Sequence, residues 1–155
     1  MKVLVIYDSV YGNTEQIAKA IAGAVPDGAA RVLKVTEASM ADLAGLDVLI
    51  VGGPTQGGRA TKAMQEFLDK IAANSLQNVR AAAFDTRLST KWVGIFGYAA
   101  GKIAESLKDK GATLIAPPHP FHVTGTKGPL KEGEAEHAAN WAKQTLEGMQ
   151  WQKDR

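Results

Sequence analysis

The chain has 155 residues, which is about the size of one domain, and 45% of them are hydrophobic, enough to bury a single core. The 18 Lys and Arg residues nearly balance the 16 Asp and Glu residues, and the charges are scattered, so neither a nucleic-acid surface nor a membrane-binding patch is expected. Cysteine is absent, which excludes disulfides, thiolate metal sites and iron–sulfur clusters, so any redox chemistry must come from a bound cofactor.

The amino terminus enters the first expected strand at once. It shows no charged region followed by an apolar stretch and a small-residue cleavage site, which would indicate a secretory leader. No apolar run approaches the length of a membrane span. We therefore expect a soluble cytoplasmic protein with a single domain over residues 1–148 and a loose tail over residues 149–155.

Strand and helix patterns alternate along the first half of the chain. Residues 3–7 are strand-forming, and Ile17, Ala18 and Ile21 then recur at helical spacing until Pro26. A second strand is predicted over residues 31–36. The continuous aliphatic run at residues 48–51 predicts a third strand that is buried on both faces.

The second half continues this alternation. Met64, Phe67 and Leu68 fit the spacing of an amphipathic helix, which we predict over residues 61–73. A fourth strand is predicted over residues 79–84, an irregular polar segment over residues 85–90, and a fifth strand over residues 113–116. Helices centred near residues 103–107 and 138–146 complete the pattern.

Five strands that alternate with helices predict an α/β fold. Parallel strands need crossover connections, and right-handed helical crossovers cover both faces of the sheet, giving three layers in the order α/β/α. A chain of this length fits a five-stranded parallel sheet with strand order 2-1-3-4-5. Its ligand is then expected beyond the carboxyl ends of the strands, at the loops that follow strands one, three and four.

A hydroxyl-rich turn joins the first strand to the first helix. Backbone N–H groups and the helix dipole attract an anion at a helix N-terminus, and Ser9, Asn13 and Thr14 add donors. A phosphate monoester suits this turn best, since the glycine-rich motifs for nucleoside triphosphates and dinucleotides are both absent. The alternative is an ordinary turn in which Asn13 or Ser9 caps the helix.

Residues 9–14 (Ser-Val-Tyr-Gly-Asn-Thr) resemble the hydroxyl-x-hydroxyl-Gly-x-Thr loop of flavodoxins, which binds the phosphate of flavin mononucleotide (FMN). The resemblance implies a flavodoxin-like fold with non-covalently bound FMN. It assigns phosphate binding to Ser9, Val10, Tyr11, Gly12, Asn13 and Thr14. Tyr11 departs from the pattern because the family usually has Thr or Ser there, so its phenol could point away from the phosphate.

Residues 52–61 hold four glycines, which let backbone approach a flat ring and let a peptide flip. The segment resembles the second flavin loop of the superfamily, and particularly the Pro-Thr-x-x-Gly pattern of its quinone reductases. This implies that Pro54 and Thr55 lie against the isoalloxazine ring, while Gln56, Gly57 and Gly58 border N5 and the dimethylbenzene edge. The loop lacks the aromatic residue of many electron carriers, so stacking must be weaker or come from elsewhere. A plain surface loop is the alternative.

The third flavin loop of the superfamily follows the fourth strand and contacts the pyrimidine end of the ring. The resemblance implies that Asp85 and Thr86 contact ribityl or pyrimidine atoms and that Arg87 lies near N1 and O2. A solvated Arg87 is the alternative. Trp92 and Tyr98 are the nearest aromatic residues that could supply a stacking face.

Two histidines, His119 and His122, could deliver a proton to a quinone, although a structural role is favoured for both. No spaced cluster of His and carboxylate residues predicts a metal site. No side chain is predicted to be catalytic, because a flavin would carry the chemistry itself.

The function implied by the resemblance is electron transfer through FMN, between a reductase and an acceptor protein. The second candidate is an FMN-dependent NAD(P)H:quinone oxidoreductase that acts on a small quinone, favoured by the Pro-Thr-x-x-Gly pattern and the near-neutral charge. The third is a flavin-free interaction module on the same fold. A response-regulator version is disfavoured because Asp8 stands alone and Gly52-Gly53 follows the third strand.

Overall fold

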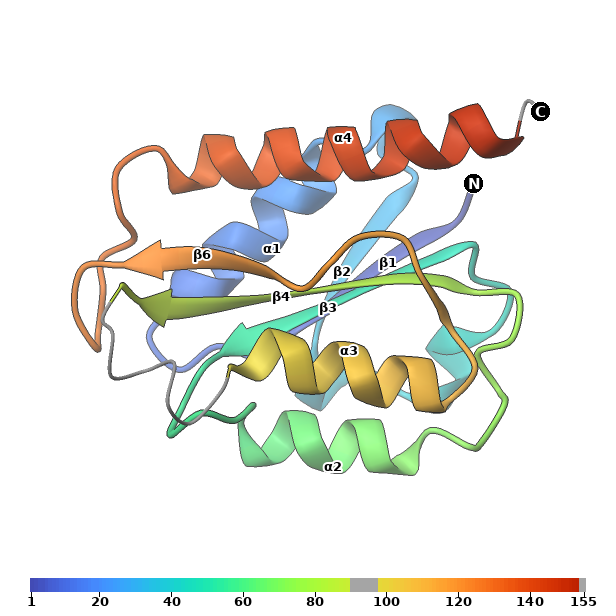
Figure 1. Ribbon diagram of the computed structural model, residues 1–155, viewed down its shortest axis with the longest axis horizontal. Helices are drawn as coiled ribbons and strands as arrows, with labels where there is room; N and C mark the ends of the chain where they lie inside the picture. The colour runs from blue at the N-terminus through green and yellow to red at the C-terminus, as the bar shows by residue number, and fades with distance from the viewer. Residues whose placement is uncertain (90–97, 154–155) are drawn as a thin grey trace.

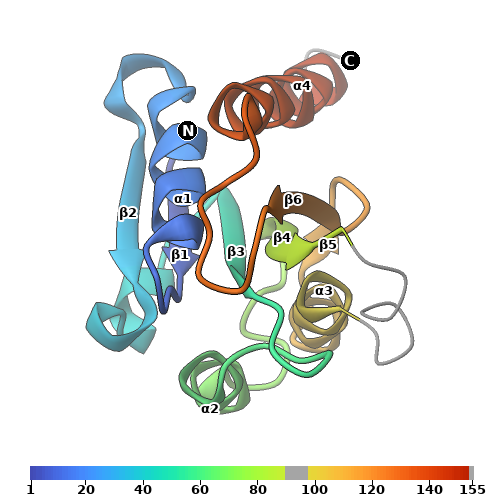
Figure 2. The ribbon, with the colours of Figure 1, turned by 90° about the vertical axis from the view of Figure 1, so that its left-hand side faces the viewer.

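The computed structural model describes residues 1–89 and 98–153, with side chains described for residues 1–89 and 98–147. In this part of the chain, one parallel sheet lies between two layers of helices (Figures 1 and 2). The strands are β1 (Val3–Tyr7), β2 (Ala30–Lys34), β3 (Val48–Pro54), β4 (Arg80–Leu88), β5 (Thr113–Leu114) and β6 (His119–Val123). The α-helices are α1 (Asn13–Gly23), α2 (Lys62–Lys70), α3 (Ala99–Asp109) and α4 (Glu134–Lys153). Short 3₁₀ helices are η1 (Pro26–Gly28), η2 (Val35–Glu37) and η3 (Met40–Leu43).

The strand order is β2-β1-β3-β4-β5, which confirms the predicted topology, but β5 and β6 share the fifth position. β5 pairs with the first residues of β4, and β6 pairs with its second half, from Phe84 to Leu88. The prediction of one strand over residues 113–116 is therefore wrong. Pro117 and Pro118 interrupt the edge because proline lacks the N–H that a ladder needs, and the prediction missed β6 beyond them.

β4 is longer than predicted, since it continues through Leu88. Asp85 lies in register with Gly53 of β3, and Thr86 lies in register with Pro54. The polar residues after Phe84 thus belong to a strand rather than to an irregular loop. Because successive side chains alternate between the faces of a sheet, Asp85 and Thr86 point to opposite layers.

The ends of two helices also differ from the sequence prediction. α2 begins at Lys62 because Thr61 is its N-cap, whose Oγ1 accepts the Met64 N–H at 3.2 Å. It ends at Lys70, since Ile71 is extended. α4 continues to Lys153, past the predicted start of the tail, and residues 149–153 contain no proline to stop it. No helix within the described ranges is long and apolar enough to cross a membrane.

Two hydrophobic clusters hold the layers together, one on each face of the sheet. Leu4, Leu49 and neighbouring residues pack against α2 and α3, whereas Val5, Phe84 and neighbouring residues pack against α1 and α4. Figure 2 shows these two helix pairs on opposite sides of the strands. Because the strands are parallel, the carboxyl ends of β1, β3, β4 and β6 meet at one edge, beside the start of α1 (Figure 1).

Candidate cofactor site

A pocket lies at the carboxyl edge of the sheet, where the topology predicts a ligand. Ten of the predicted site residues line it: Ser9, Val10, Tyr11, Asn13, Thr14, Pro54, Thr55, Gln56, Thr86 and Arg87. Three further residues complete the lining, namely Leu88, Val123 and Thr126. The loops that the sequence assigns to one site are therefore brought together around one hollow.

The other predicted residues have different positions. Gly12 is the N-cap of α1, and Asp85 is fully buried outside the lining. Gly57 and Gly58 have φ values of 54° and 79°, and Gln56 and Arg59 on either side exchange two backbone hydrogen bonds of 2.8 and 3.0 Å. These two glycines thus form a type I′ hairpin turn, which requires positive φ at both positions. Trp92 lies outside the described residues.

The first loop is rich in donors for an oxyanion. Ser9 Oγ accepts the N–H groups of Gly12 at 3.0 Å and Glu15 at 3.4 Å, which leaves its own O–H free to donate. Thr14 Oγ1 lies 2.8 Å from Thr86 Oγ1, so one of these two hydroxyls also keeps a proton to donate. The first N–H groups of α1 have no acceptor within the helix. This donor set fits a phosphate.

Tyr11 and Val10 form the exposed rim of the same loop, with 50% and 52% of their surface accessible. The departure of Tyr11 from the flavodoxin pattern thus places a half-exposed phenol at the mouth of the pocket. The predicted N-cap role of Asn13 is wrong, because Gly12 is the N-cap and no side chain caps it. Ser9 instead binds the first turn from outside the helix.

The end of β1 is fixed by two polar side chains. Asp8 accepts the Thr61 hydroxyl with Oδ2 and the Ser9 N–H with Oδ1 at 2.9 Å, which links the first loop to the start of α2. The Tyr7 hydroxyl donates to Glu15 Oε1 at 2.8 Å. Burial, aided by this bond, raises the pKa of Tyr7 to about 12, and the same bond lowers the pKa of Glu15. Tyr7 therefore remains a neutral donor at the base of α1.

The loop after β6 forms a wall that the sequence reasoning missed. Val123 and Thr126 line the pocket, and Gly128 packs on the Asn13 side chain so closely that an added Cβ would lie 2.7 Å from Nδ2. Only glycine permits this approach. The sequence carries no clear signal for this wall, because the strand that precedes Gly125 and Gly128 was not predicted.

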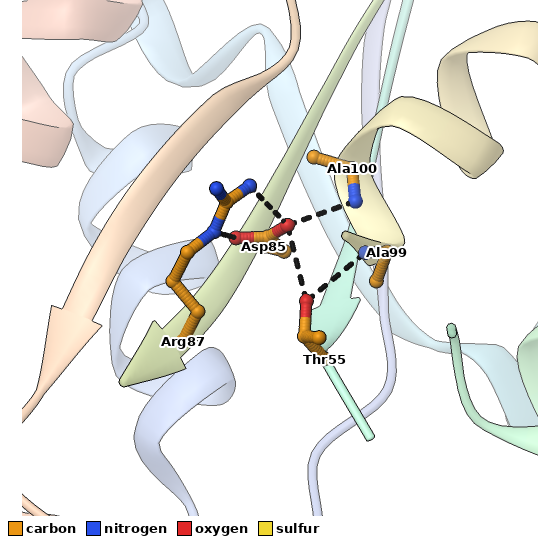
Figure 3. Close-up of polar contacts among 5 residues, drawn as sticks. All are labelled: Thr55, Asp85, Arg87, Ala99 and Ala100. Atoms are coloured by element: carbon orange, nitrogen blue, oxygen red, sulfur yellow. Dashed lines mark hydrogen bonds and ion pairs between the residues drawn. The ribbon is translucent and has the colours of Figure 1, made fainter. Parts of the chain in front are cut away.

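Asp85 is the centre of a network below the pocket (Figure 3). Its Oδ1 accepts Arg87 Nε–H at 2.8 Å, and its Oδ2 accepts Arg87 Nη2–H at 2.7 Å. Oδ2 also accepts the Ala100 N–H at 2.9 Å and the Thr55 hydroxyl at 3.2 Å. Thr55 Oγ1 in turn accepts the Ala99 N–H at 3.0 Å. The network joins the ends of β3 and β4 to the first turn of α3.

Tyr98 does not offer a free stacking face on the side of Arg87. The guanidinium carbon of Arg87 lies 3.3 Å from the centre of the Tyr98 ring, a cation–π contact. The alternative of a solvated Arg87 is excluded, because its side chain is only 13% exposed and is paired with Asp85. Among the described residues, the second loop supplies no aromatic residue to the pocket.

The two histidines of β6 lie away from this pocket. His119 stacks on Trp141 of α4 with ring centres 5.3 Å apart, and its Nε2 lies 2.9 Å from His137 Nε2. The backbone N–H of His122 donates to Glu134 Oε2 at 2.7 Å. These contacts favour the structural role. No group of three or more His, Asp or Glu side chains in the described ranges converges as a metal site.

The sequence has relatives of two kinds. The model of the flavodoxin family matches residues 5–146. Flavodoxin 1 of Salmonella typhimurium is 28% identical over 127 residues, which cover 80% of this chain and 72% of that protein. An NAD(P)H dehydrogenase (quinone) of Cupriavidus metallidurans is 38% identical over 100 residues, which cover 50% of each protein.

Solved flavodoxin structures share the fold over nearly the whole chain. Oxidised Flavodoxin 2 from Bacillus cereus has a TM-score of 0.79 and 24% identity, and the match covers 95% of this chain and 99% of that one. An archaeal flavodoxin has a TM-score of 0.78 and 23% identity, with 95% and 97% covered. With the family model matched over most of its length, this chain belongs to the flavodoxin family, whose cofactor is FMN.

Proposed function

We propose that the chain is an electron carrier that binds FMN non-covalently in the pocket at the carboxyl edge of the sheet. The observation that supports this most is the donor set of the first loop, where Ser9, Thr14 and the N-terminus of α1 converge at the switch point of a flavodoxin fold. Bound FMN supplies the one- and two-electron chemistry, and no protein side chain needs to react.

In this proposal the protein's residues bind and orient the cofactor. Ser9, Asn13 and Thr14 hold the phosphate, and Thr86 supports Thr14 from β4. Pro54, Thr55 and Gln56 border the ring from the end of β3. Arg87 lies beside Thr55, on the same Asp85 carboxylate, and supplies donors. Flavodoxins act with redox partner proteins, and we expect this chain to act in the cytoplasm between a reductase and an acceptor protein.

A quinone reductase is the second candidate. It is supported by the relative in Cupriavidus metallidurans and by the Pro-Thr-x-x-Gly pattern at Pro54 and Thr55, but that relative matches only 50% of either protein. Steady oxidation of NADPH by the pure holoprotein, with a benzoquinone as acceptor, would favour this enzyme. A carrier should instead need a separate reductase.

The first test is a titration of the apoprotein with FMN, followed by quenching of flavin fluorescence, alongside riboflavin, which lacks the phosphate. We expect stoichiometric FMN binding and much weaker riboflavin binding. Thr14→Val should weaken FMN binding about tenfold, the loss of one hydrogen bond to a charged group, and leave riboflavin binding unchanged. Thr113→Val, at an exposed position of β5, is the matched control.

Each outcome bears on a separate part of the proposal. A colourless protein that leaves FMN fluorescence unchanged would exclude both flavin-dependent functions and favour an interaction module. Equal affinities for FMN and riboflavin would contradict the phosphate site at the first loop. Equal effects of Thr14→Val and Thr113→Val would lead to the same conclusion.

A further inference from the structure

We infer that Asp85 is a positioning residue that holds Arg87 and Thr55 in the wall of the cofactor pocket and compensates the charge of Arg87, so that the pocket presents a neutral ion pair. This inference rests on the proposed function, because it concerns FMN bound in that pocket. Asp85 does not line the pocket itself, whereas Arg87 and Thr55 do. It therefore acts on a bound cofactor through these two neighbours (Figure 3).

The geometry shows that the carboxylate is fully engaged. Asp85 has no accessible surface, and both of its oxygens accept hydrogen bonds from the guanidinium of Arg87, at 2.8 and 2.7 Å. Paired bonds of this kind fix both the position and the plane of the guanidinium. The backbone N–H of Ala100 adds a further donor from the first turn of α3. A buried carboxylate requires such compensation, since an unpaired one is strongly destabilising.

Arg87 is held on a second side. Its guanidinium carbon lies 3.3 Å from the centre of the Tyr98 ring, and its side chain is 13% exposed. The two bonds to Asp85 use two of the five N–H donors of a guanidinium, which leaves donors for an acceptor in the pocket. The pair thus offers hydrogen bonds to a ligand without offering an uncompensated positive charge.

Thr55 is oriented by the same carboxylate. Its hydroxyl donates to Asp85 Oδ2 at 3.2 Å and accepts the Ala99 N–H at 3.0 Å, so its only proton is already used. The Thr55 hydroxyl consequently has no proton left to donate to a ligand. Asp85 therefore orients two neighbouring side chains of the pocket lining.

The expected consequence concerns the flavin potential. Reduced flavin carries more negative charge than oxidised flavin, and a positive charge in the wall binds the reduced form more tightly. Asp85→Asn leaves Arg87 uncompensated and should favour the reduced form at least tenfold. For a two-electron couple, a tenfold change in the equilibrium constant corresponds to about 30 mV toward a less negative potential.

The test measures FMN potentials and FMN affinities of four holoproteins: wild type, Asp85→Asn, the double variant Asp85→Asn/Arg87→Gln, and Asp109→Asn as the control. Asp109 is an exposed residue at the end of α3, so its variant matches the charge change. We expect Asp85→Asn to raise the potential by at least about 30 mV. The double variant should return most of the way to the wild-type value, because both charges are removed, and the control should not change.

Two results would overturn the inference while FMN binding stands. One is an Asp85→Asn potential equal to that of the wild type. The other is a double variant that keeps the full shift. If wild-type protein binds no FMN, the proposed function fails instead, and the two failures are therefore distinguishable.

A readout in the wild-type apoprotein needs neither flavin nor a variant that folds. The Arg87 Nε–H should give a resolved NMR signal that exchanges slowly with water at neutral pH, because it donates to Asp85. A signal that exchanges as fast as that of an exposed arginine would show that the pair does not hold Arg87.

Discussion

Two polar networks lie on opposite faces of the sheet and differ in what sets their charge. The Asp85 network connects β4 to α3 through an arginine. The second network connects β6 to α4 through His119, His137 and Glu134. The first network contains an arginine, whose guanidinium stays protonated at every working pH, whereas the second contains histidines, the residue type that changes charge near neutral pH.

In the histidine network, the donor and acceptor roles of the two rings are linked. His137 Nδ1 lies 3.0 Å from Glu134 Oε1, and when this nitrogen donates to the carboxylate, Nε2 of a neutral His137 must accept. The facing Nε2 of His119, 2.9 Å away, is then the donor. Two fully protonated rings would place two N–H groups against each other. The contact between the two rings therefore needs one donor and one acceptor.

The comparison suggests why each network lies where it does. Arg87 lines the pocket, and its pairing with Asp85 does not depend on a group that titrates near neutral pH. The proton-dependent network lies behind β6, where His119 and Trp141 stack within a cluster of aromatic rings. There it holds a helix on the sheet, and a change in its charge acts on stability.

The largest expected effect is on stability when Asp85 is truncated. Asp85→Ala leaves the guanidinium of Arg87 and the Ala100 N–H without their acceptor, and it should cost about 3–5 kcal/mol of unfolding free energy. Urea denaturation of the apoprotein measures this loss. Asp109→Ala, at an exposed site of α3, should stay within about 0.5 kcal/mol. A loss below about 1 kcal/mol for Asp85→Ala would show that the two networks do not differ in the way described.

A smaller loss is expected for Arg87→Lys. Lysine keeps the charge but cannot form two parallel bonds to Asp85 or stack as a plane on Tyr98, so about 2 kcal/mol should be lost. The control is Arg31→Lys in the more exposed pair of Arg31 with Asp42, where the loss should be below about 1 kcal/mol. Equal losses in urea denaturation would contradict a special role for the buried pair.

The corresponding change in the histidine network is Glu134→Gln. The two carboxylate oxygens of Glu134 face the His137 ring and the His122 N–H. The amide of glutamine has a single oxygen, so it can accept a hydrogen bond from only one of these two donors. We expect a loss of about 1–2 kcal/mol in thermal or urea unfolding. Glu136→Gln, on an exposed part of the same helix, should have little effect. An unchanged unfolding free energy in Glu134→Gln would mean that this network does not stabilise the packing of α4 on β6.

The smallest effect is a dependence of stability on pH. Burial, with help from the nearby His137, lowers the pKa of His119 below its usual value of about 6.5. Below about pH 6.5 the unfolded chain binds a proton that the folded chain does not. The unfolding free energy should therefore fall as the pH is lowered, until the pH reaches the lowered pKa of folded His119. The slope is at most about 1.4 kcal/mol per pH unit, and stability above pH 6.5 is unaffected.

Denaturation curves across this range should show a reduced slope in His119→Gln. The Asp109→Asn variant should keep the wild-type slope, because that residue lies on the opposite helix layer. If His119→Gln titrates like the wild type, another group carries the pH dependence, and the proposed division between the two networks fails.

The sequence predicted the parts of the site that local patterns determine. Of the six residues named in the first loop, all but Gly12 line the pocket, and their role in binding stays a prediction. The strand order followed from the alternation of elements and was confirmed. The loop could be read from one short segment, whereas the strand order needed the alternation of strands and helices along the whole chain.

What the sequence did not predict depends on contacts between distant segments. Asp85 was expected to touch the cofactor from a loop, but β4 continues past it, paired with β3 on one side and with β6 on the other. β6 was itself missed because it contains Pro120 and directly follows Pro117 and Pro118, and proline is a poor strand former. The paired hydrogen bonds between Asp85 and Arg87 could be predicted only once both residues were known to lie in one strand, on the same face of the sheet.

The interrupted edge of the sheet has a consequence for association. An open edge strand presents unpaired backbone groups that another chain can join as an additional strand. Here β5 has only two residues, Pro117 and Pro118 follow it, and Pro120 lies within β6. Three prolines in a short span remove N–H donors from the border that a second sheet would need. The break in the fifth position thus protects this side of the molecule from edge-to-edge aggregation.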